Sequence, residues 1–127
     1  MSRVVVAAGS NIDPLQNLHR AARVMSERFH LLAEASPRAT EPVGPPGQPL
    51  FWNAGYFFET DLDPVDLKAA LQGIESEFGR VRTGNRYAPR PLDLDEIWRD
   101  GAVVDGDVHD RLYLREILTE LGIDLSR

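Results

Sequence analysis

The sequence has no cysteine, one lysine and no long hydrophobic run. Without cysteine there is no disulfide, no thiolate nucleophile and no cysteine-based zinc site. The lysine, Lys68, is not part of a GxxxxGK[ST] sequence, which excludes a lysine-dependent P-loop. No apolar stretch approaches the roughly 20 residues that cross a bilayer, and the N-terminal MSRVVVAAGS is typical of a strand rather than a signal peptide. We therefore expect a cytoplasmic protein with no membrane partner.

Basic charge is also scarce. The formal net charge is −6, and an acidic chain is a poor candidate for general nucleic-acid binding, which favours basic surfaces. With 127 residues, of which 43% are hydrophobic and 27% charged, the chain is long enough for one core of ordinary size. We expect a single domain over residues 1–127 and no nucleic-acid partner.

Apolar periodicity predicts strands and helices in the order β-α-β-β-α-β, which is the ferredoxin-like α+β arrangement with an antiparallel sheet. The predicted strands are Arg3–Ala8, Leu31–Thr40, Phe51–Thr60 and Leu92–Asp95, and the helices run from Asp13 to Phe29 and from Asp63 to Phe78. An added hairpin turns at Asp100-Gly101 and leads to Ala102–Val104. A short helix at roughly Leu112–Leu121 follows it.

Start and stop signals support both long helices. Asp13-Pro14 gives an N-cap followed by proline at the first helical position, with Gln16 placed to complete a capping box. Asp63-Pro64 repeats this pattern, and Gly79 ends the second helix. Pro37 is expected to break the second strand, and the prolines and glycines of Pro42–Pro49 predict a loop.

Arginine is concentrated just after the second helix. Four arginines and no acid occupy one stretch of eleven residues: Arg80, Arg82, Arg86 and Arg90. Guanidinium groups suit polyphosphate oxygens, so Arg82 and Arg86 could reach a polyphosphate and Arg90 could orient it. The ordinary alternative is that these side chains are scattered salt-bridge partners on the surface.

Two acids follow this stretch at once. Asp93 and Asp95 alternate with Leu92 and Leu94, so both carboxylates point to one face of a strand, about 7 Å apart. Such a pair can share one or two magnesium ions bridged by phosphate oxygens. Taken alone, the pair is better explained as the solvent-exposed side of an amphipathic strand. With the arginines before it, it indicates phosphoryl-type chemistry on a metal–nucleotide complex.

Several other residues have two readings. The aromatic residues of Phe51–Thr60 are expected to lie in the core. A subset beside Asn53 could instead sandwich a flat heterocycle, with the Asn53 amide hydrogen-bonding to the edge of the ring. Tyr87 could face a nucleobase or only pack. In the turn Gly9–Asn11, the Asn11 side chain is expected to cap local backbone.

Three titratable residues are assigned to the surface. Glu75 and Glu77 are expected on the exposed side of the second helix. His109, followed by an aspartate and an arginine, is expected in a solvated turn rather than at a catalytic position.

These pieces together resemble the 6-hydroxymethyl-7,8-dihydropterin pyrophosphokinase family of folate biosynthesis. The resemblance rests on AAGSN (Ala7–Asn11), on TEPVGPPGQPLFWNA (Thr40–Ala54) and most specifically on R-x-x-P-R-x-L-D-L-D, which begins at Arg86 and ends at Asp95. It runs from the first strand to about Val104.

The resemblance implies an enzyme that transfers the β,γ-pyrophosphoryl group of ATP to the pterin hydroxymethyl oxygen with two magnesium ions, held by Asp93 and Asp95. The implied catalytic residues are Arg82, Arg86, Arg90, Asp93 and Asp95. The implied ATP-binding residues are Gln72, Glu75, Arg82, Tyr87, Arg90 and Arg111, and the implied pterin-binding residues are Thr40, Val43, Phe51, Asn53 and Tyr113. Its partners are pterin and ATP, and a monomer or weak homo-oligomer is expected.

Two of the departures from the family pattern lie in or near the implied site. The segment Asp107–Leu114 compresses a longer family stretch, and Glu96 puts a third acid where an apolar residue is normal. A catalytically altered relative that binds a pterin or a different acceptor is therefore the alternative hypothesis.

Overall fold

The computed structural model describes residues 1–40, 50–80 and 90–125. Its centre is a five-stranded antiparallel sheet in the order β2-β3-β1-β4-β5. The elements are β1 (Ser2–Ser10), α1 (Pro14–Arg28), β2 (His30–Thr40), β3 (Phe51–Thr60), α2 (Pro64–Glu77), β4 (Asp93–Arg99), β5 (Ala102–Val103), α3 (Asp107–Asp110) and α4 (Leu112–Glu120). The β-α-β-β-α-β order and the added hairpin and helix are as the sequence predicts.

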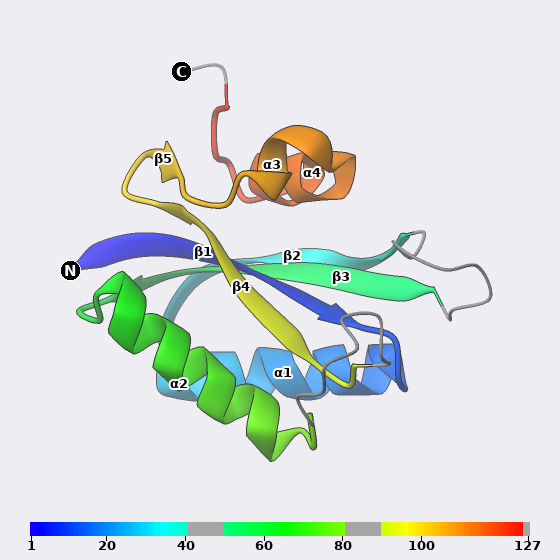
Figure 1. Cartoon of the computed structure of the whole chain (residues 1–127). Helices are drawn as coiled ribbons and strands as arrows, with labels where there is room; N and C mark the ends of the chain where they lie inside the picture. Colours follow the sequence, from blue (N-terminus) through cyan, green and yellow to red (C-terminus); the bar gives the residue numbers. More distant parts are fainter. Residues whose placement is uncertain (41–49, 81–89, 126–127) are drawn as a thin grey trace.

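Helices cover both faces of this sheet (Figure 1). Because side chains alternate along a strand, the central strand β1 supplies two cores. Val4 and Val6 pack on the α1 and α2 side, and Val5 and Ala7 pack on the α4 side. Every residue from Val4 to Ser10 is buried. The sheet is therefore a rigid central layer from which side chains of β3 and β4 can be presented.

The two long helices begin differently, although their sequences look alike. The Asp63 carboxylate accepts a hydrogen bond of 2.8 Å from Asp66 N, as a capping residue should. The capping box predicted at Asp13 is wrong. Asp13 has a left-handed backbone with φ of 41°, and its side chain makes no cap hydrogen bond. Without that hydrogen bond, Gln16 has no capping box to complete.

Two turns decide how strands connect. Gly79 ends α2 with φ of 84°, and Asp100 and Gly101 have φ of 47° and 92°, as a two-residue hairpin requires.

The prediction that Pro37 breaks β2 is wrong. The strand runs through it with a register shift between Ala35 and Arg38, which an edge strand tolerates because its outer N–H groups need no partner.

Helix α4 is fixed on the sheet by close packing and by charge. A Cβ on Gly55 would clash with Cγ2 of Ile117, so the glycine lets α4 approach β3. At the sheet edge, Glu120 accepts a 2.6 Å hydrogen bond from Ser36 N and pairs with Arg38. The short helix α3 before it was not predicted from sequence. It carries His109, which is exposed as expected.

Candidate active site

The strand register brings the sequence-predicted residues onto one face of the sheet. Gly9 of β1 lies opposite Asn53 on one side and opposite Asp93 on the other. One row further, Ala7 lies between Gly55 and Asp95. Residues directly opposite one another share a face, and adjacent strands are about 4.8 Å apart, so Asn53 and Asp93 are separated by about 10 Å. The small residues of β1 form the floor between them.

Asn53 is held in a defined orientation on this floor. It is buried, and its Nδ2 donates a 2.6 Å hydrogen bond to Thr40 Oγ1. A Cβ on Gly9 would lie 3.0 Å from Asn53 Oδ1 and 3.6 Å from a ring carbon of Phe51. Glycine therefore leaves the space that these side chains face. Thr40, Phe51 and Asn53 form one group, as the resemblance implies.

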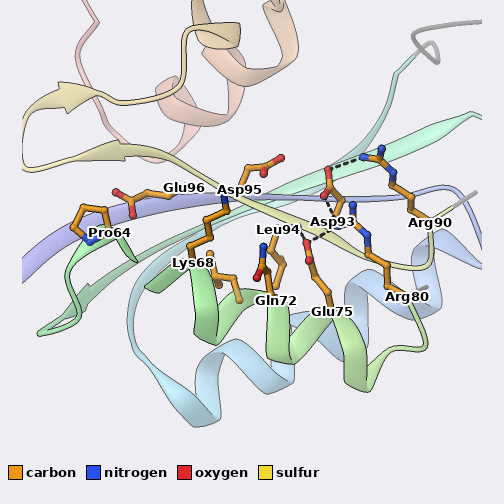
Figure 2. Close-up of a pocket in the computed structure, with 11 residues that line it drawn as sticks. Pro64, Lys68, Gln72, Glu75, Arg80, Arg90, Asp93, Leu94, Asp95 and Glu96 are labelled. Carbon is orange, nitrogen blue, oxygen red and sulfur yellow. Dashed lines mark hydrogen bonds and ion pairs between the residues drawn. The ribbon is translucent and has the colours of Figure 1, made fainter. Parts of the chain in front are cut away.

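The outer edge of β4 is open next to the two acids. In the part of the chain that the structure describes, β5 pairs only with Trp98 and Arg99. The Leu94 N–H instead donates to Glu75 Oε2 of α2, at 2.7 Å. A pocket of about 440 Å³ lies along this edge between β4 and α2 (Figure 2). Its lining residues are Pro64, Lys68, Leu71, Gln72, Glu75, Arg80, Arg90, Asp93, Leu94, Asp95 and Glu96.

One end of the pocket is an ionic network centred on Arg80. Its Nη1 is 2.7 Å from Glu75 Oε2 and 2.6 Å from Asp93 Oδ1. Arg90 Nη1 lies 3.5 Å from Asp93 Oδ2. Asp93 is thus faced by two guanidinium groups, and Figure 2 shows both arginines converging on it. These are the groups that phosphate oxygens would meet at this end.

The surface assignment of Glu75 is wrong. The residue is only 2% exposed, and its carboxylate joins α2 to β4 through Arg80 and Leu94 N. Glu77 is exposed as expected, and it pairs with Arg28. The sequence carried a signal for this difference, since Glu75 follows Leu71 by four residues and so continues the buried stripe of the helix.

Asp95 has the most perturbed environment in the pocket. Its side chain keeps a solvent-accessible side, but protein atoms around the carboxyl group desolvate it and raise its pKa to about 7. Negative charge on Asp93, on Asp105 and, less strongly, on Glu75 acts in the same direction. A carboxylate in this setting is costly to ionise, and a cation placed beside it would reverse that cost.

The acid pair fits a hard divalent cation in chemistry, because carboxylate oxygens are the ligands that Mg²⁺ prefers. Within residues 1–40, 50–80 and 90–125, no group of three or more acidic, His or Cys side chains is arranged to hold a metal. Two carboxylates leave most positions of an octahedral ion to water and phosphate oxygens, which is the usual situation for magnesium that accompanies a nucleotide.

Asn11 connects the end of β1 to Arg90. Its side-chain Oδ1 accepts a 2.6 Å hydrogen bond from Arg90 N, and its backbone N donates to Arg90 O at 3.0 Å. The expectation that Asn11 caps local backbone is therefore wrong, because its partner is 79 positions away. Its Nδ2 is buried and has no hydrogen-bond partner among the residues that the structure describes. These contacts fix where the backbone enters β4.

The remaining predicted site residues fall into three groups. Gln72 lines the pocket. Arg111 and Tyr113 are outside its lining; Arg111 Nε is 3.6 Å from Asp107 Oδ2, and Tyr113 packs against the α4-side core. Four residues lie outside the described ranges: Val43, Arg82, Arg86 and Tyr87. Lys68 was missed as a pocket residue, because a single lysine on a helix carries no motif.

Glu96, the acid noted as unusual in sequence, lines the far end of the pocket. It forms an ion pair with Arg99, at 2.8 Å and 3.1 Å, and Arg99 also donates to Leu62 O.

No helix among the described residues is long and apolar enough to cross a membrane.

Comparison with known proteins gives a consistent result. The model of the family described as 7,8-dihydro-6-hydroxymethylpterin-pyrophosphokinase (HPPK) matches residues 5–122. A 2-amino-4-hydroxy-6-hydroxymethyldihydropteridine pyrophosphokinase of Haemophilus influenzae is 35% identical over 98% of this chain and 84% of its own length. The corresponding protein of Pseudomonas aeruginosa is 43% identical over 75% of this chain and 60% of its own length. A mitochondrial folate synthesis bifunctional protein of Pisum sativum is 37% identical over 96% of this chain, which spans 25% of that protein.

The structure combines a ferredoxin-like antiparallel sheet with an acid–arginine cluster at the open edge of β4. With the match over residues 5–122, the chain belongs to the 7,8-dihydro-6-hydroxymethylpterin-pyrophosphokinase family. It is a pyrophosphokinase, an enzyme of the diphosphotransferase class.

Proposed function

We propose that the chain transfers the β,γ-pyrophosphoryl group of ATP to the hydroxymethyl oxygen of a 6-hydroxymethyl-dihydropterin, and that Asp93 and Asp95 lie where the two substrates meet. One observation carries this proposal. The acid pair lines the pocket between β4 and α2, and it also shares a sheet face with Asn53 across the floor of Gly9 and Ala7. A nucleotide in the pocket and a flat ring on the floor would both reach the carboxylates.

In this proposal Asp93 and Asp95 would hold two magnesium ions. When bound, the ions would neutralise the polyphosphate and align its oxygens. Arg80 and Arg90 already face Asp93, so they stand close to the position of the transferred group and can stabilise its charge. Positioning and charge stabilisation provide most of the catalysis in this type of reaction.

Glu75 acts in this proposal through Arg80 rather than as a ligand of the nucleotide. Its Oε2 accepts hydrogen bonds both from Arg80 and from Leu94 N. The first bond keeps the guanidinium directed at Asp93, and the second fixes the β4 backbone between the two acids. Glu75 is therefore a positioning residue for the acid pair.

The pterin is proposed to lie on the floor beside Thr40, Phe51 and Asn53. The Asn53 amide can donate and accept, as the edge of a pterin ring requires, and Phe51 offers an apolar face. The hydroxymethyl group of the pterin would then point along the floor toward Asp93 and Asp95. By the strand spacing, Asp93 is about 10 Å from Asn53.

Other assignments stay predictions. They are the catalytic roles of Arg82 and Arg86, nucleotide contacts of Gln72, Tyr87 and Arg111, pterin contacts of Val43 and Tyr113, a single domain, a cytoplasmic location, and a monomer or weak homo-oligomer.

The test is an assay for AMP release with 6-hydroxymethyl-7,8-dihydropterin, ATP and Mg²⁺. We expect AMP only when all three are present, and no turnover from Asp95→Ala or Asp93→Ala. Asp61→Ala is the matched control, since this aspartate is exposed and pairs with the N-terminus. Substantial activity in Asp95→Ala contradicts the proposal. Pterin binding without nucleotide binding in calorimetry would instead favour the altered relative.

A further inference from the structure

Lys68, the only lysine of the chain, lines the pocket. On α2 it belongs to a row of lining residues spaced by four, four and three: Pro64, Lys68, Gln72 and Glu75. Residues at these spacings share one face of a helix. Figure 2 shows Lys68 rising from α2 beside Pro64 and Glu96, at the end of the pocket away from the arginines.

The two arginines of the pocket lining are paired within the protein, and so is the acid Glu96. Arg80 contacts Glu75 and Asp93, Arg90 contacts Asp93, and Glu96 is paired with Arg99 outside the lining. Within the part of the chain that the structure describes, Lys68 has no hydrogen bond or ion pair. Its ammonium group, with three N–H donors, is thus available to a molecule in the pocket.

The position of Lys68 along the pocket indicates which part of that molecule it would meet. Lys68 precedes Glu75 by seven positions, which is about 10 Å along the helix axis at 1.5 Å per residue. Phosphates at the Arg80–Asp93 end would leave the sugar and base of a nucleotide at the Lys68 end. We propose that Lys68 donates a hydrogen bond to an acceptor atom on the sugar or base of the nucleotide, and so determines nucleotide affinity. This inference rests on the proposed function.

A residue at the nucleoside end is remote from the transferred group, so it affects binding more than chemistry. For Lys68→Gln we expect the KM for ATP to rise about tenfold, as loss of one hydrogen bond to a charged group would give, with kcat within about twofold. Lys68→Arg keeps a charged donor and is expected to recover most of the affinity. Arg23→Gln on α1 is the control, since it removes an exposed cation outside the pocket.

Amine acylation tests the contact directly. With one lysine, an acylating reagent has only the Lys68 Nζ and the Met1 α-amino group as amine targets. We expect Mg²⁺ with α,β-methylene-ATP to lower acylation of Lys68 at least fivefold and to leave Met1 unchanged. Peptide mass spectrometry separates the two sites, and Met1 serves as the internal reference.

Two results overturn the inference, and they are distinguishable. If calorimetry shows the analogue bound while Lys68 is acylated at its free rate and Lys68→Gln keeps the wild-type KM, the inference fails and the proposed function stands. If the wild-type protein binds no nucleotide at all, the proposed function fails and the inference fails with it. Equal melting temperatures of the variants and the wild type will show that folding is not the cause.

Discussion

Replacement of Glu75 is the sharpest test of how the site is built. Glu75 and Glu77 stand two residues apart on α2, and in the sequence only the helical spacing from Leu71 distinguishes them. In the structure Glu75 is 2% exposed and anchors Arg80 and Leu94 N, whereas Glu77 is a surface partner of Arg28. Glu75→Ala should therefore destabilise the fold strongly, and Glu77→Ala should change it little.

The size of the effect follows from what each variant leaves behind. Removing one member of a buried pair costs about 3–5 kcal/mol when the other charge is stranded. Arg80 keeps Asp93 as a partner, which reduces that cost, but Leu94 N is left buried without an acceptor, which adds about 1–3 kcal/mol. We expect a loss of about 3 kcal/mol. At about 4 °C for each kcal/mol in a domain of this size, Tm falls by roughly 10 °C.

The measurement is thermal and urea unfolding of both variants, followed by circular dichroism, with Mg²⁺ titrations of turnover for Glu75→Gln. The glutamine variant keeps the side-chain volume and an acceptor for Leu94 N but loses the charge opposite Arg80. It should fold, but it should need more Mg²⁺ for half-maximal rate. Arg80 no longer shares its charge with Glu75, so it pairs more strongly with Asp93 and competes with the metal ion. Equal Tm changes in Glu75→Ala and Glu77→Ala, or an unchanged Mg²⁺ requirement, would refute the reasoning.

Three further predictions concern stability. The pKa of Asp95 is about 7 in the fold against an ordinary 3.8, so the folded state holds the proton more tightly and stability falls as pH rises between these values. Urea unfolding should therefore show that Asp95→Asn raises the free energy of unfolding at about pH 8 and leaves it unchanged at about pH 4. The expected gain, discounted for solvent screening, is on the order of 1 kcal/mol. Gly55→Ala should cost about 1–3 kcal/mol by overpacking against Ile117, and the double variant with Ile117→Ala should lose less than the sum of the single losses. In thermal unfolding Asp63→Ala should cost about 1 kcal/mol, whereas Asp13→Gly should cost nothing, because Asp13 makes no cap bond and has φ of 41°.

Much of the fold was predictable because local signals and global packing agree. Periodicity located β3 and both long helices, and the alternation of Leu92 to Asp95 correctly separated the buried leucines from the acids. The errors in the fold are at Asp13 and Pro37, and the short helix α3 was missed. Capping and strand breaking depend on backbone geometry, and residue type alone does not fix that geometry.

The candidate site was predictable in its chemistry and not in its contacts. The acid pair and the arginines were identified from spacing. The network from Glu75 through Arg80 to Asp93 joins α2, the turn after it and β4, and no sequence pattern encodes which helix residue meets an unpaired strand N–H. The bridge between Asn11 and Arg90 likewise depends on tertiary contact between distant segments.

The brevity of β5 has a consequence for redesign. Two residue pairs join it to β4, so the first half of β4 keeps its outer backbone groups for Glu75 and for the pocket. A variant with a longer hairpin would add rungs to the sheet and become more heat-resistant, yet the added strand would occupy the cleft. Laboratory selection for thermostability at this edge would therefore select against catalysis.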